Sequence, residues 1–173
     1  MAGYIYIGEV NELGSEQFVW MFGNVVESYK EAAVAVAEKV PFKNVGDLCN
    51  AFSEHLENLS KDEKQKILSL HPDLAGRLAD TEELTEESAR EQKSAELNAL
   101  DPEKKAKINL LNYNYKTKFG FPFVICAREN KANVIMEQLA VRYKNTLDQE
   151  INTGINEVKK ITNLRILDLV LDY

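Results

Sequence analysis

The sequence predicts an all-α fold, a single compact and irregular helical bundle that spans residues 1–173. Apolar residues recur at spacings of three or four along most of the chain, which is the period of a helix with one buried face. The chain has only 8 Gly and 4 Pro, too few for a loop-rich β protein. Only residues 4–7 have the pattern of a short strand, and the alternative there is a loose extension over residues 1–10.

In the first half of the chain, the predicted helices carry clear start and stop signals. They cover residues 15–23, 31–39, 45–59 and 61–70. Ser15, Asn44 and Ser60 stand at predicted N-caps, where a side-chain oxygen can accept a hydrogen bond from the first turn. The fourth helix should end at His71, because Pro72 disfavours the helical conformation in the residue before it.

The second half contains stronger signals. Helices are predicted at residues 86–97, 102–119, 131–143 and 147–171. Thr85 should open the first of these, and Asp101 followed by Pro102 is a typical start for the second. Gly120 should end that helix in the left-handed conformation. The apolar run 121–127 suits either a buried extended segment or the start of a buried helix, and periodicity does not decide between them.

Composition argues against several functional classes. Acidic residues outnumber basic ones 28 to 21, which argues against nucleic acid as a partner because phosphate binding needs a basic surface. No apolar run approaches the ~20 residues of a membrane helix, so no membrane partner is expected. Cys49 and Cys126 are expected in the core and are too few for a disulfide scaffold, which suggests a reducing compartment. His55 is expected to be solvated, and two histidines leave little room for a multi-histidine metal centre.

His71 is the first candidate for chemistry. An imidazole titrates near neutral pH, and the end of a helix can direct it into a cavity. The alternative is a histidine that only caps the helix with a hydrogen bond. Position alone leaves both interpretations open.

Ser88, Glu91 and Gln92 form the second candidate group. Spacings of three and four place them on one helix face, where they could offer a hydroxyl, a carboxylate and an amide to a small polar ligand. The alternative is a solvated acidic face, because residues 82–91 are rich in glutamate. That alternative defines a different class of function, a non-catalytic helical interaction module that binds a basic partner.

Arg165 is the third candidate. It stands among apolar residues of the last predicted helix, and an arginine buried there must find a partner. Its planar guanidinium suits bidentate binding of a ligand carboxylate. A structural salt bridge to an acidic side chain explains it equally well.

Four motifs occur in one order along the chain. They are His71-Pro72-Asp73-Leu74-Ala75-Gly76, Ser88-x-x-Glu91-Gln92, Phe119-Gly120-Phe121-Pro122-Phe123-Val124 and Glu157-Val158-x-Lys160-Ile161-x-x-Leu164-Arg165. Together they resemble the OHCU decarboxylases, where OHCU is 2-oxo-4-hydroxy-4-carboxy-5-ureidoimidazoline, a compound of the urate-to-allantoin pathway. The resemblance covers nearly the whole chain, from Phe18 to Leu169.

The resemblance implies a helical, cofactor-free carboxy-lyase that converts OHCU to (S)-allantoin in purine catabolism. His71 and Glu91 match its catalytic positions. The substrate-binding positions that it implies are Pro72, Ser88, Gln92, Phe123, Val124, Ile125, Cys126, Ala127 and Arg165. It implies no metal ligand.

The chemistry that the resemblance implies suits these residue types. OHCU carries a C=N bond next to the carbon that loses CO2, so the substrate supplies its own electron sink. His71 can move a proton, and Glu91 can hold the imidazole in one tautomer and favour its charged form. Arg165 can orient the departing carboxylate, and backbone N–H groups of 123–127 can bind ring carbonyls.

The resemblance also implies a homodimer and a peroxisomal location. The C-terminal Leu171-Asp172-Tyr173 is not a peroxisomal targeting tripeptide, so the cytoplasm is the alternative.

Overall fold

The computed structural model describes residues 3–75 and 84–173 and confirms a mostly helical fold. The chain divides into two compact units. The first comprises Met1–Lys64 and Lys159–Tyr173, and the second comprises Gln65–Val158.

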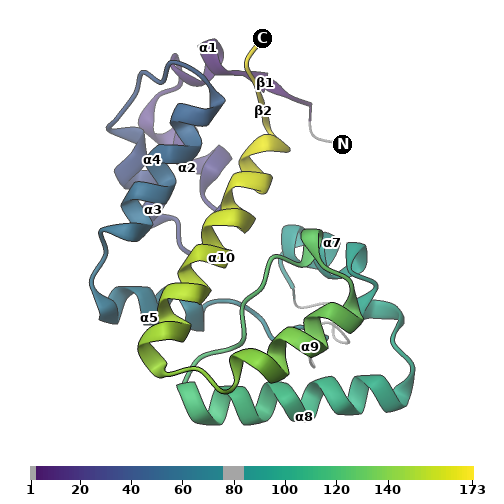
Figure 1. The fold of residues 1–173 in the computed structure, drawn as a ribbon. Coiled ribbons are helices and arrows are strands. Elements are labelled where there is room, and N and C mark those ends of the chain that lie inside the picture. Colours follow the sequence, from purple (N-terminus) through teal and green to yellow (C-terminus); the bar gives the residue numbers. More distant parts are fainter. Residues whose placement is uncertain (1–2, 76–83) are drawn as a thin grey trace. The chain divides into compact units, whose positions relative to one another are not determined.

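Helices dominate the described residues, and none of these helices is long and apolar enough to cross a membrane. In chain order the elements are β1 (Ile5–Tyr6), α1 (Ile7–Val10), α2 (Ser15–Phe22), α3 (Glu31–Ala37), α4 (Val45–Glu57), α5 (Lys61–Ser69), α7 (Glu86–Ser94), the short 3₁₀ helix η1 (Leu97–Ala99), α8 (Pro102–Phe119), the 3₁₀ helix η2 (Ala127–Glu129), α9 (Ala132–Arg142), α10 (Leu147–Leu167) and β2 (Val170–Leu171). Figure 1 shows their course.

The first unit contains both ends of the chain. β1 and β2 pair in parallel, with Ile5 opposite Val170, and the Ile5 N–H donates to the Leu169 carbonyl at 2.9 Å. Packed aromatic rings form much of its core: the ring centroids of Phe18 and Phe22 lie 4.7 Å apart. Residues 5–10 are thus joined to the C-terminal residues, and the side chain of Val10 is fully buried.

Local signals predicted several helix ends correctly. The side chains of Asn44, Ser60 and Thr85 each accept a hydrogen bond from a backbone N–H of the first turn. Asp101 does the same for α8, at 2.8 Å from the Lys104 nitrogen. These ends are predictable because a cap and its helix are neighbours in sequence.

Several predicted helix boundaries were wrong, among them the ends at residues 39 and 59, where the helices stop at Ala37 and Glu57. The N-cap of α2 is Gly14 rather than Ser15, which is the first helical residue. The helix expected to reach residue 97 ends at Ser94, because Glu96 adopts a left-handed backbone with φ +65°. The last helix ends at Leu167, because the residues after it turn to pair with β1.

His55 corrects a further expectation. It was expected to be solvated, but it lies half-buried on α4, and its Nε2 has no hydrogen-bond partner among the residues that the structure describes. Burial, helped by the nearby charge of Lys39, lowers the pKa of His55 below its usual value. A buried ring nitrogen beside a lysine favours the neutral imidazole.

Gly120 ends α8 in the predicted left-handed conformation, with φ +85°. A Cβ at this position would meet no atom within 4 Å, so only backbone strain opposes a side chain. Gly120→Ala is therefore expected to lower the free energy of unfolding by about 1–2 kcal/mol, measured by urea denaturation. Gly8→Ala in α1 is the matched control, with equally open space and no left-handed φ. Equal effects of the two substitutions would refute the strain argument.

Candidate functional site

His71 follows the end of α5 and is buried, with 8% of its surface exposed. Its Nδ1 lies 3.0 Å from the carbonyl oxygen of Ile67. A carbonyl only accepts hydrogen bonds, so Nδ1 carries the hydrogen and the neutral ring keeps its lone pair on Nε2. The backbone of α5 thus fixes the tautomer of the neutral ring.

The loop that follows His71 is held by side chains of α7 and α8. Gln92 Oε1 accepts a hydrogen bond from the Ala75 N–H at 2.9 Å, and its Nε2 donates to the Asp73 carbonyl at 3.3 Å. Asn112 Nδ2 donates to the Leu74 carbonyl at 2.8 Å. Sequence reasoning did not identify Asn112, because it contacts a residue 38 positions away.

Helix α7 buries the face that carries Ser88, Glu91 and Gln92, whose exposed fractions are 5%, 9% and 4%. Arg90 and Lys93 are exposed to solvent. These three predicted site residues are therefore not part of a solvated acidic face. Glu82 and Glu83, which belong to the predicted acidic face, lie outside the described residues.

The segment 123–127 is buried throughout and stays non-helical until η2 begins at Ala127, so the extended alternative is confirmed. Arg142 Nη1 donates to the Val124 carbonyl at 2.8 Å. The Cys126 N–H donates to Glu157 Oε1 at 3.0 Å, so this donor is already engaged within the protein. In the described part of the chain, nothing hydrogen-bonds the backbone of Ile125.

Helix α7 connects these parts of the second unit. Its Gln92 binds the loop after His71, and the helix also packs against η2, where the segment 123–127 ends. Helix α7 therefore contacts both the loop that follows the buried His71 and the end of the buried segment 123–127. Pro72, which follows His71 in the chain, is half-buried.

Arg165 belongs to the first unit, whereas the other predicted site residues belong to the second. Its Nη1 donates to the Asn24 carbonyl at 2.8 Å and to Glu27 Oε1 at 3.2 Å. Arg165 and Glu27 are each 3% exposed, so the salt bridge that the sequence offered as an explanation is present and buried.

The thiol of Cys126 is not a nucleophile at neutral pH. Burial raises the pKa of Cys126 from 9.0 to about 11, and burial raises the pKa of Cys49 to the same value. Their thiols therefore stay protonated, and a protonated thiol reacts slowly. Both side chains are buried, as the sequence predicted.

We expect iodoacetamide at pH 7.5 to leave the folded protein unmodified and fully active, with two adducts per chain appearing only in denaturant. Mass spectrometry of both samples measures this. Because folding raises both thiol pKa values from 9.0 to about 11, their contribution to stability is complete below about pH 9 and is lost as the pH rises toward 11. Rapid labelling of Cys126 in the folded protein would contradict this.

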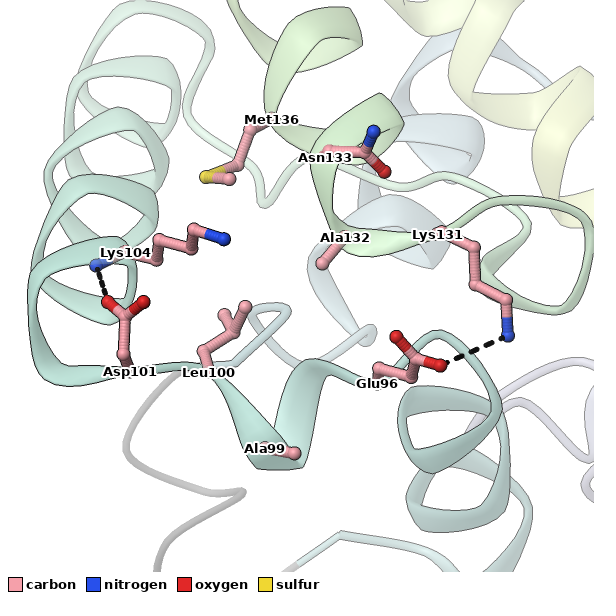
Figure 2. A pocket seen from close by; sticks show the side chains of 9 residues that line it. All are labelled: Glu96, Ala99, Leu100, Asp101, Lys104, Lys131, Ala132, Asn133 and Met136. Carbon is pink, nitrogen blue, oxygen red and sulfur yellow. Dashed lines mark hydrogen bonds and ion pairs between the residues drawn. The ribbon is translucent and has the colours of Figure 1, made fainter.

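A separate cavity of about 670 Å³ lies among η1 and the first turns of α8 and α9. It is lined by Glu96, Ala99, Leu100, Asp101, Lys104, Lys131, Ala132, Asn133 and Met136, none of them a predicted site residue (Figure 2). Asp101 already caps α8, and Lys131 lies 3.9 Å from Glu96. Three of its charged side chains thus already interact within the protein. Among residues 3–75 and 84–173, no group of three or more His, Cys, Asp or Glu side chains could hold a metal ion.

Comparison with known sequences identifies close relatives. A family model described as OHCU decarboxylase matches residues 11–167. A 2-oxo-4-hydroxy-4-carboxy-5-ureidoimidazoline decarboxylase of Xenopus laevis is 42% identical over 166 residues, which is 96% of this chain and 95% of the relative. The protein of the same name from Amia calva is 45% identical over 162 residues, which is 94% of this chain and 93% of the relative.

Solved structures share the fold. A crystal structure of (S)-allantoin synthase aligns with a TM-score of 0.75 and 21% identity over 95% of this chain, which spans 53% of that protein. An OHCU decarboxylase crystallised in the presence of (S)-allantoin aligns with a TM-score of 0.69 and 22% identity, over 90% of this chain and 97% of that one. At these identities the likeness concerns the fold.

Proposed function

The chain belongs to the OHCU decarboxylase family, and we propose that it converts OHCU to (S)-allantoin in urate degradation without a cofactor. The observation that carries the proposal is the state of His71. Its ring is buried, and the Ile67 carbonyl holds Nδ1, so Nε2 would be the nitrogen that exchanges a proton.

The substrate itself makes a cofactor unnecessary. The bond between the ring carbon and its carboxylate breaks, CO2 leaves, and the electron pair moves into the adjacent C=N bond. The neighbouring carbon then takes a proton on one face, which sets the (S) configuration. The protein must therefore bind the ring in one orientation and deliver one proton.

His71 is suited to that proton transfer. In its neutral form Nε2 can accept a proton from the substrate hydroxyl, and the resulting imidazolium can donate a proton to carbon. Nδ1 keeps its hydrogen bond to Ile67 throughout, so the ring need not rotate between the two steps. Glu91 is buried on the helix that binds the His71 loop, and its carboxylate would favour the charged imidazolium.

Buried polar groups supply candidates for substrate binding. The backbone N–H and C=O of Ile125 lie in a buried residue and need partners, which a ring amide of the substrate offers. Ser88 adds a buried hydroxyl on α7, and Gln92 fixes the loop that carries Pro72. Arg165 is the candidate that would orient the carboxylate that departs, because a guanidinium can bind a carboxylate through two parallel hydrogen bonds.

The test generates OHCU in situ from urate with two upstream enzymes and follows allantoin by circular dichroism. With this protein, we expect optically active allantoin to form faster than in its absence. The matched control contains the same concentration of heat-denatured protein. Unchanged spontaneous decay to racemic allantoin would refute the proposal.

We also propose a homodimer located in the peroxisome or the cytoplasm. Light scattering should give twice the chain mass of 19.6 kDa, and a single-chain mass would contradict the dimer. Fluorescence imaging of the tagged chain decides the compartment.

A further inference from the structure

Three side chains hold one edge of the segment 123–127. Arg142 of α9 donates to the Val124 carbonyl, and Glu157 of α10 accepts from the Cys126 N–H. Asn130 Nδ2 donates to the Cys126 carbonyl at 2.9 Å. All three bonds thus fall on residues 124 and 126, two positions apart.

That spacing has a geometric consequence. In an extended chain, the N–H and C=O of successive residues point to opposite sides, so residues 124 and 126 share one edge. Ile125 therefore presents its N–H and C=O to the other edge. This agrees with the lack of a hydrogen-bond partner for the Ile125 backbone among the described residues.

Arg142 is itself held rigidly. Its Nε donates to Glu150 Oε1 at 3.0 Å, and its guanidinium carbon lies 4.3 Å from the centre of the Phe123 ring. The Tyr115 hydroxyl donates to the same oxygen of Glu150, a residue with 0% of its surface exposed. The guanidinium of Arg142 is planar, and Glu150 holds it through Nε. Its Nη1 therefore fixes the position of the Val124 carbonyl.

We propose that Arg142 and Glu157 are positioning residues for the decarboxylation, which hold Val124 and Cys126 so that the Ile125 backbone faces the substrate ring. This inference rests on the proposed function. A mispositioned donor or acceptor weakens substrate binding and orientation, and a displacement of about 1 Å can cost up to about 100-fold in rate.

A purely structural role makes a different prediction. If these residues only stabilise the fold, their replacement lowers the fraction of folded protein, which lowers the apparent kcat and leaves KM unchanged. If they position the segment, KM rises in the molecules that remain folded. The division between KM and kcat therefore separates the two roles.

The experiment compares Arg142→Lys, Glu157→Leu and Glu157→Gln with the wild type in the dichroism assay. Lysine keeps the positive charge of Arg142 but lacks its planar set of N–H donors. Leucine removes the carboxylate of Glu157 that accepts from Cys126. KM should therefore rise about tenfold in each of these two variants. Glutamine keeps a side-chain oxygen that accepts from Cys126, so Glu157→Gln should retain a KM close to that of the wild type. His55→Asn is the control, because His55 lies on α4 in the first unit, outside the network that holds the segment.

Unchanged KM in Arg142→Lys and Glu157→Leu, with active wild type, would overturn this inference alone. An inactive wild type would instead refute the proposed function and the inference with it. If Arg142→Lys or Glu157→Leu does not fold, Asn130→Ala decides. This variant removes the half-buried hydrogen bond from Asn130 to the Cys126 carbonyl, and the KM of the variant should rise about threefold. An unchanged KM there would equally overturn the inference.

Discussion

Replacing His71 with asparagine is expected to lower kcat/KM by a factor of about 10³, within the range attributed to general acid–base catalysis. The asparagine amide can still donate to the Ile67 carbonyl, so the turn after α5 should persist. It has no group that exchanges a proton near neutral pH, so the reaction loses its proton carrier. Initial rates of the dichroism signal, with far-ultraviolet spectra to verify folding, measure the effect.

His55→Asn is the control for that experiment, because it removes the other histidine of the chain. His55 lies on α4 in the first unit and has no role in the proposed reaction. We expect its kcat/KM to stay within twofold of the wild type. Full turnover by the His71 variant would show that another group moves the proton.

Replacing Arg165 with methionine should have the second largest effect. The change leaves the Glu27 carboxylate, which is 3% exposed, without its cation. Removing one partner of a buried ion pair typically costs about 3–5 kcal/mol of unfolding free energy. Urea denaturation measures this loss, and activity should disappear with it.

The double variant Glu27→Gln, Arg165→Met separates stability from catalysis. It removes both charges, so much of the unfolding free energy should return. If Arg165 also orients the substrate carboxylate, kcat/KM should stay about 100-fold below the wild-type value despite this recovery. Recovered activity in the double variant would show that Arg165 serves only to balance Glu27.

Sequence predicted well those features that depend on near neighbours. Asp101, Pro102 and Gly120 mark both ends of α8 correctly, because a cap and a left-handed stop act within one turn. The end of α5 before His71 followed from the proline after it. The burial of Ser88, Glu91 and Gln92 agrees with the shared face that their spacing predicted.

Features that depend on contacts between residues far apart in the sequence could not be predicted from it. The sequence indicated that a buried Arg165 needs a partner, but Glu27 lies 138 positions away and nothing local selects it. Periodicity did not decide between helix and extended chain for 123–127, whose conformation depends on Arg142 and Glu157 of later helices. The network of Arg142, Glu150 and Tyr115 could not be predicted for the same reason.

The central claim is that a site built around His71 converts OHCU to a single enantiomer of allantoin. The most direct measurement records the dichroism of allantoin formed from in situ OHCU with wild type, with His71→Asn and with no protein. The account predicts a rapid (S)-allantoin signal for the wild type, while the other two samples give slow racemic product. A wild-type trace that coincides with the protein-free trace would contradict it.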